Sequence, residues 1–132
     1  MKKKRIMVDM SATLIHHGHI RLLKKAKKLG YVIVALTKDL QVKKCKGYNP
    51  EIKYKYRKEI LLSIKYVDKV IESNWAIDDK FLKKNKIDIL IRGHDHSKQK
   101  FHTQTKILKR TKDISSSVIR KKVLSNYKKN AY

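Results

Sequence analysis

Several residue types are scarce in this sequence, and each scarcity excludes a class of protein. The only cysteine, Cys45, cannot form a disulfide within the chain, which makes a reducing cytoplasm the expected location. No apolar run approaches the roughly 20 residues that a membrane-spanning helix requires. The basic residues 2–5 are like the start of a signal peptide, but Asp9 interrupts the apolar run that follows them. We therefore expect no membrane insertion.

Acidic residues are also few, since 11 Asp and Glu oppose 35 Lys and Arg and leave a formal charge of +24. A charge of this size invites a nucleic-acid-binding interpretation. Only six of the 35 basic residues are Arg, however, and Arg makes the bidentate contacts that nucleic-acid surfaces often use. The lysines are spread through every segment. We expect non-specific binding to polyanions at low salt, and a function of another kind.

Apolar residues make up 41% of the chain, which has no repeats, so residues 1–132 are expected to form a single domain with a real core. The apolar pattern predicts strands at 5–10, 31–37, 69–72, 87–91 and 105–110. Helical spacing predicts helices at 19–29, 54–66, 74–86 and from 115 onward, with a polar connection at 38–53. The first strand, helix and strand imply a right-handed parallel unit. The expected fold class is α/β, a Rossmann-like three-layer α/β/α structure with a five-stranded parallel sheet.

Three histidines surround a glycine where the first strand leads into the first helix. We expect Gly18 to allow a tight turn there, which places His19 in the first turn of the helix. Free backbone N–H groups and the positive end of the helix dipole favour an anion at this point. His16 and His19 can project to the same side, with Arg21 nearby. This arrangement predicts a receptor for a polyphosphate.

Two other interpretations of these histidines remain open. They could be ordinary polar loop residues, or they could form a zinc site of a metal-dependent hydrolase with a second cluster: His16, His17, His19, His94, Asp95 and His96. Metalloprotease helices usually carry two ligands four residues apart and a catalytic Glu, and neither cluster has these features. We therefore assign no metal ligand.

The sequence His16-x-Gly18-His19 resembles the HxGH motif of the nucleotidyltransferase superfamily. Residues 110–116, Arg-Thr-Lys-Asp-Ile-Ser-Ser, resemble the RTxGIST signature of its cytidylyltransferase family. Residues 56–61 and 66–71 look like the middle segment of that family. Asn74-Trp75 and residues 93–96 also fall where its glycerol-3-phosphate branch carries NW and GDDW.

The resemblance implies transfer of CMP from CTP to a small phosphorylated alcohol, with release of pyrophosphate. Glycerol 3-phosphate is the first expectation, and phosphocholine, phosphoethanolamine or an aminoalkylphosphonate are alternative acceptors. Such a reaction needs substrate position and charge neutralisation but no general base, because the acceptor phosphate is already ionised. The resemblance further implies substrate-bound Mg²⁺, a homodimer and a product used in surface-polymer synthesis.

The resemblance also assigns roles to individual residues. The catalytic set comprises His16, His19, Lys46 and Arg110. The nucleotide-binding set comprises Ser11, Ala12, Gly18, His19, Lys44, Gly93, Asp95, Arg110, Thr111, Ile114, Ser115 and Ser116. Acceptor binding is assigned to Arg57, Asn74, Trp75 and Thr13, with scaffolding as the alternative for the first three. Ser at a helix start is also an ordinary N-cap, so the serines could serve that purpose alone.

The sequence departs from the family pattern at three places. Thr13 stands where the family has an Asp, Asp113 replaces the Gly of RTxGIST, and residues 94–96 are His-Asp-His. These departures leave open a nucleotide-binding protein with weakened catalysis.

Overall fold

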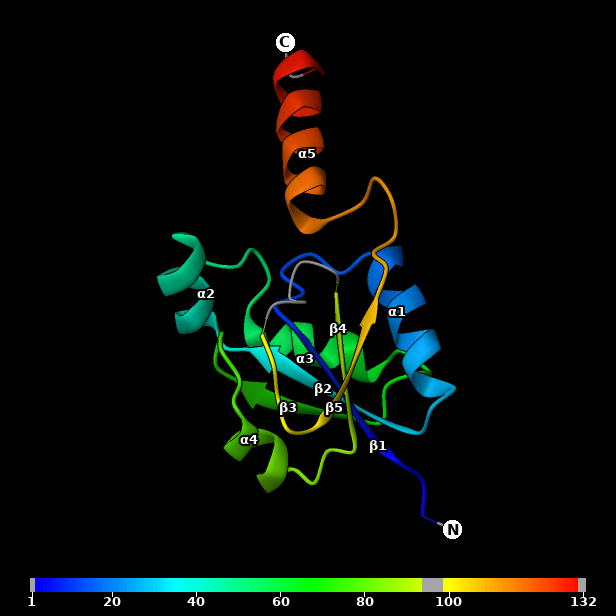
Figure 1. Cartoon of the computed structure of the whole chain (residues 1–132). Helices are drawn as coiled ribbons and strands as arrows, with labels where there is room; N and C mark the ends of the chain where they lie inside the picture. Colours follow the sequence, from blue (N-terminus) through cyan, green and yellow to red (C-terminus); the bar gives the residue numbers. More distant parts are fainter. Residues whose placement is uncertain (1, 94–98, 131–132) are drawn as a thin grey trace.

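Five parallel strands form one sheet in the order β3-β2-β1-β4-β5. Figure 1 shows the sheet with its flanking helices. The computed structural model describes residues 2–93 and 99–130. The strands are β1 (Arg5–Met10), β2 (Tyr31–Thr37), β3 (Lys69–Ser73), β4 (Ile89–Gly93) and β5 (Gln104–Leu108). The helices are α1 (His17–Lys27), α2 (Asp39–Lys46), α3 (Tyr54–Leu62), α4 (Asp79–Lys84) and α5 (Ser116–Asn130).

Alternate residues of the central strands enter two separate hydrophobic layers. In β2, Val32 and Val34 pack in the layer that includes Leu23 of α1 and Leu61 of α3. The intervening Ile33 packs on the opposite face, in the layer that includes residues of α4. Successive side chains of a strand point to opposite faces, so a sheet covered on both sides needs nearly continuous apolar strands. The predicted three-layer fold and its five-stranded parallel sheet are confirmed.

The predicted polar connection at 38–53 is wrong in part, because α2 forms within it. Only Val42 of this helix is buried, so no apolar periodicity marks it in the sequence. Gly47 ends the helix with φ of 82°, a left-handed conformation that glycine adopts at little cost.

The predicted helix over 74–86 is reduced to α4. Its N-cap is Asp78, whose carboxylate accepts a hydrogen bond from the backbone N–H of Phe81 at 2.8 Å. Asn74 and Trp75 therefore lie in the loop after β3 and do not begin a helix.

Helix α5 extends away from the sheet beyond the C-terminal ends of the strands (Figure 1). Residues 121–129 are exposed, and Val123, Leu124 and Tyr127 leave large apolar side chains in solvent. None of the helices in the described part of the chain is long and apolar enough to cross a membrane.

The strand order reverses between β1 and β4, because the chain moves outward from β1 in both directions. In open parallel sheets, ligands bind outside the carboxyl ends of the strands at such a point. The C-terminal ends of β1 and β4 are therefore where a site is expected.

Candidate active site

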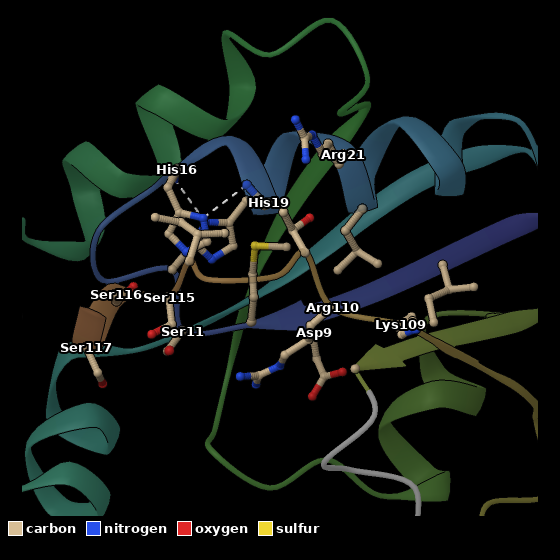
Figure 2. Close-up of a pocket in the computed structure, with 18 of the residues that line it drawn as sticks. Asp9, Ser11, His16, His19, Arg21, Lys109, Arg110, Ser115, Ser116 and Ser117 are labelled. Carbon is tan, nitrogen blue, oxygen red and sulfur yellow. Dashed lines mark hydrogen bonds between the residues drawn. The ribbon is translucent and has the colours of Figure 1, made fainter. Parts of the chain in front are cut away.

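A cavity of about 340 Å³ lies at this position, at the ends of β1 and β4 and beside the start of α1 (Figure 2). Most of the side chains that the sequence predicted as a site line it together. They are Ser11, Ala12, His16, Gly18, His19, Lys46, Trp75, Gly93, Arg110, Thr111, Ile114, Ser115 and Ser116. The two motifs, almost 100 residues apart in the chain, thus face one space.

The two histidines of the first motif form the N-terminal cap of α1. The Nδ1 atom of His16 accepts a hydrogen bond from the Gly18 N–H at 3.1 Å, and the Nδ1 atom of His19 accepts one from the His16 N–H at 3.1 Å. This is a capping box built from imidazoles, with the two ring centroids 4.0 Å apart. Because both Nδ1 atoms are acceptors, each neutral ring carries its proton on Nε2. Both rings therefore offer an Nε2–H donor.

Both imidazoles are neutral near pH 7. Burial, aided by repulsion from His16 when that ring is protonated and from Arg110, lowers the pKa of His19 to about 3. Burial also lowers the pKa of His16, with smaller effects from His17 and Arg110. The histidines thus act as oriented neutral donors, and the positive charge of the cavity comes from its lysines and arginines.

Gly18 matters here for close packing and not for the predicted tight turn. Its φ is not in the left-handed region, so backbone freedom is not the reason. A Cβ at this position would lie 2.9 Å from Cε1 of His16 and 3.2 Å from Cγ2 of Ile114. The absence of a side chain lets the His16 ring and the second motif approach the helix start.

The segment between β5 and α5 supplies the opposite wall of the cavity. The Oγ atom of Ser115 accepts a hydrogen bond from the Val118 N–H at 3.1 Å, so this serine caps α5 as the capping interpretation expected. Asp113 has φ of 62°, a conformation that favours glycine, and it stands where the resembling motif has Gly. Ser117 also lines the cavity but was not predicted.

Lys46 and Trp75 reach the cavity from α2 and from the loop after β3. The Lys46 ammonium lies 5.6 Å from the centroid of the Trp75 ring. The Trp75 backbone N–H donates to Oε1 of Gln41 at 3.1 Å, which ties the loop to α2. Lys44 and Asn74 are exposed and do not line the cavity, although the sequence assigned them to the site.

The acceptor assignment of Arg57 is corrected by its burial, because its side chain is 0% exposed. Its guanidinium donates to the Ile52 carbonyl at 2.9 Å, the Ser11 carbonyl at 2.6 Å and the Asp39 carboxylate at 2.6 Å. Arg57 is therefore a scaffold under the Ser11 loop, which was the alternative role.

The acceptor assignment of Thr13 is also corrected. Its side chain is 0% exposed, and its Oγ1 accepts a hydrogen bond from Nη2 of Arg120 at 2.7 Å. Thr13 therefore lies behind the loop that carries the histidines and not in the cavity.

Sequence reasoning did not assign three charged residues that line the cavity, Asp9, Lys25 and Lys109. It noted a fourth, Arg21, only as lying near the histidines. Asp9 pairs with the buried Arg92, whose Nη2 and Nε lie 2.8 Å and 3.2 Å from its two carboxylate oxygens. The sequence does show one Asp in an apolar strand and one Arg in another. Pairing these two residues, however, requires knowing that β1 and β4 are neighbours in the sheet.

The zinc interpretation needs residues on two segments. His94, Asp95 and His96 lie outside the described residues, and so does the predicted nucleotide contact of Asp95. Within the ranges 2–93 and 99–130, no group of three His, Cys, Asp or Glu side chains could hold a metal ion.

Comparison with known proteins gives matches over most of the chain. A family model described as Cytidylyltransferase-like matches residues 11–122. The chain is 37% identical over 128 residues to the glycerol-3-phosphate cytidylyltransferase of Staphylococcus aureus. This alignment covers 91% of the chain and 95% of that protein. The chain is 36% identical over 129 residues to the Bacillus subtilis protein of the same name, covering 91% and 97%.

A solved structure shows the same architecture. The lipopolysaccharide core biosynthesis protein of Thermoplasma volcanium aligns with a TM-score of 0.65 at 26% identity, covering 82% of this chain and 96% of that one. The resemblance first indicated by the two motifs is confirmed. Because the family model and both relatives span most of its length, the chain belongs to the cytidylyltransferase-like family and is a nucleotidyltransferase.

Proposed function

We propose that the enzyme transfers CMP from CTP to glycerol 3-phosphate, giving CDP-glycerol and pyrophosphate. The observation that carries the proposal is the histidine capping box facing the Arg110–Ser116 segment across one cavity. The names of the Staphylococcus aureus and Bacillus subtilis relatives support this choice of substrates.

The reaction is an in-line displacement at the α-phosphorus. A phosphate oxygen of the acceptor forms a bond to that phosphorus, and the bond from the phosphorus to the β-phosphate oxygen breaks. Negative charge grows on the α-phosphate oxygens and on the leaving pyrophosphate. In this proposal the Nε2–H groups of His16 and His19 donate to the α-phosphate, while Arg110 and the backbone N–H groups at the start of α5 bind the β- and γ-phosphates.

The charge of the cavity suits two polyanionic substrates. Among its described lining residues there are five cations and one carboxylate: Arg21, Lys25, Lys46, Lys109, Arg110 and Asp9. Asp9 is already neutralised by Arg92. Attraction between this lining and the substrates offsets the repulsion of two bound anions.

The same lining favours glycerol 3-phosphate over the amino-alcohol acceptors. A quaternary ammonium is usually bound on aromatic faces. The face of Trp75 already has the Lys46 ammonium over it, at 5.6 Å from the ring centroid. A primary amine would need a carboxylate, and Asp9, the one carboxylate among the described lining residues, is already paired with Arg92.

We propose that Mg²⁺ enters with the triphosphate. Mg²⁺ prefers oxygen ligands and is commonly bound by substrate phosphates together with one or two carboxylates. In the described lining only Asp9 is a carboxylate, so the substrate phosphates would supply most of the oxygen ligands of the ion. When bound, Mg²⁺ supplies charge neutralisation on the leaving group.

Pyrophosphate release tests the proposal. CTP and ATP are offered with Mg²⁺ and a panel of phospho-alcohols, and calorimetry measures CTP binding in parallel. Signal with CTP and glycerol 3-phosphate supports the proposal, and signal with an amino-alcohol phosphate corrects the acceptor. CTP binding without turnover on any acceptor indicates the weakened nucleotide-binding protein. Copurification with stoichiometric zinc or iron, together with an irreversible loss of activity on chelation, indicates the metal-dependent hydrolase.

We further propose a cytoplasmic homodimer whose product feeds surface-polymer synthesis. The single exposed Cys45 supports a reducing location, and the exposed Val123, Leu124 and Tyr127 of α5 offer apolar area for a partner. Sedimentation in buffers of low and high salt separates a dimer, which persists, from polyanion binding, which salt weakens.

A further inference from the structure

Outside the cavity, Arg120 connects three segments that are distant in the sequence. From the second turn of α5, its Nη2 donates to Thr13 Oγ1 at 2.7 Å. Its Nε and Nη2 also form a bidentate pair with the Glu51 carboxylate, both at 2.6 Å. The guanidinium carbon lies 4.4 Å from the centroid of the Tyr48 ring, so the aromatic face covers the cation.

A second contact from α5 reaches the next residue of the same loop. The Oγ atom of Ser116 donates to the Leu14 carbonyl at 3.0 Å and accepts from the Leu14 N–H at 3.3 Å. Thr13 and Leu14 are therefore both attached to the start of α5. Two residues later the chain reaches His16, whose N–H is the donor that orients the His19 ring.

Glu51 is the only counter-charge in this cluster of described contacts. Thr13 offers a neutral hydroxyl, so it can accept one hydrogen bond but cannot hold a guanidinium in position by charge. The bidentate carboxylate fixes the plane of the guanidinium, and the remaining N–H of Nη2 is then aimed at Thr13. The pair is only partly buried, with 21% of the Arg120 side chain and 47% of the Glu51 side chain exposed. Its contribution to global stability is therefore modest.

We infer that Glu51 and Arg120 are positioning residues, which hold the Thr13–Leu14 loop so that His16 and His19 meet the α-phosphate. The inference rests on the proposed function, because it concerns the histidines of the transfer site. Neither residue contacts the cavity. Their effect is on the placement of the imidazole donors, where a displacement of about 1 Å can cost on the order of a hundredfold in rate.

The test separates positioning from structural support. Glu51→Gln removes the charge and keeps the shape of the side chain. We expect kcat to fall about tenfold or more, with KM for CTP changed by less than about twofold, because the donors matter most in the transition state. The double variant Thr13→Asp with Glu51→Gln returns a carboxylate to Arg120 from the loop itself, and we expect kcat within about threefold of the parent.

Lys27→Gln is the matched control, because it breaks the partly exposed Lys27–Asp68 pair at 2.7 Å on the opposite end of the sheet. Lys27→Gln should change the Tm about as much as Glu51→Gln does, and it should leave kcat unchanged. The inference is overturned if Glu51→Gln leaves kcat unchanged, if only KM changes, or if the double variant does not recover.

A second readout does not depend on turnover. If the parent enzyme is inactive with every acceptor, the proposed function fails, and amide hydrogen exchange then decides the inference alone. Glu51→Gln should accelerate exchange at Leu14 and His16, whose N–H groups bond to Ser116 and His19. Exchange equal to that of the Lys27→Gln variant would show that the pair does not hold the loop.

Discussion

The two ends of the same sheet differ in how their charges are matched. At the N-terminal end of β2, Asp68 accepts hydrogen bonds from Lys27 Nζ at 2.7 Å and from the Val32 N–H at 2.8 Å. Burial alone would raise the pKa of Asp68, but these hydrogen bonds outweigh it and hold the pKa below its ordinary value. At the C-terminal end, the residues of ranges 2–93 and 99–130 that line the cavity include five cations and one carboxylate.

This difference separates structure from function in one fold. Where a carboxylate and its donors balance within the chain, as at Asp68, the charges contribute to stability and need no ligand. Where cations outnumber carboxylates, a bound anion reduces the repulsion between the cations and so lowers the free energy of the folded protein. Changes at the N-terminal end should therefore alter unfolding, and changes at the C-terminal end should alter turnover.

The largest expected effect is at Arg92, which is an exception to that division. It is 3% exposed and holds Asp9 at the cavity edge. Arg92→Met should lower the free energy of unfolding by about 3 kcal/mol, because it leaves the Asp9 carboxylate, which is only 13% exposed, without its ion pair. Urea denaturation measures this loss. Adding Asp9→Asn should recover part of it, and no recovery would contradict the pairing.

The next effect is on catalysis at His16. Asn is a good N-cap, so His16→Asn keeps the helix cap but removes the Nε2–H donor. We expect kcat to fall roughly 100- to 1,000-fold, the usual cost of losing one donor to developing negative charge. The Tm should change little. A variant with near-normal kcat would remove His16 from the proposed mechanism.

Asp68→Ala tests the opposite end of the sheet. It leaves the Val32 N–H without its acceptor, so the free energy of unfolding should fall by about 1–3 kcal/mol. Turnover should be normal at temperatures where the variant is folded. Asp68→Asn is the control, since an amide oxygen can still accept from Val32. Loss of kcat in a folded Asp68→Ala enzyme would break the contrast between the two ends.

Acid should destabilise the protein through His19. Its pKa is lowered in the folded state, so the unfolded chain binds the proton more readily between pH 6.5 and about 3. Stability is complete above pH 6.5 and falls as the pH drops through that window, by at most about 1.4 kcal/mol per pH unit. Urea denaturation at pH 7 and pH 5 measures the slope, which should be smaller in His19→Asn.

The smallest effect is expected at Asp113. Its φ of 62° is unfavourable for a residue with a Cβ, although Asp tolerates it better than most. Asp113→Gly should raise the free energy of unfolding by up to about 1 kcal/mol, with the cavity unchanged. A decrease in Tm would show that the Asp side chain has a stabilising contact in this turn.

Much of the site was predictable because its motifs are local. His16, Gly18 and His19 cap one helix, and Ser115 caps another, so short stretches carry the information. The apolar strands predicted the parallel sheet, whose carboxyl ends bring the two motifs together. Helix α2 was missed because it buries only Val42 and therefore shows no periodic pattern.

The roles of the buried charged and polar residues were not predictable in the same way. Arg57 and Thr13 stand close to motif residues in the sequence pattern, and both were assigned to the acceptor. Their side chains instead meet Ser11 and Arg120, which are 46 and 107 residues away. Local spacing holds no information about such partners.

The sequence by itself determined the fold class, the two motifs and the excess of positive charge, because each depends on residue type and short-range spacing. Only the tertiary structure decided which cations face the cavity, which arginines serve as scaffolds, and that His16 and His19 stay neutral at a lower pH than a free imidazole. Those properties depend on burial and on contacts between segments far apart in the chain, and neither exists until the sheet has formed.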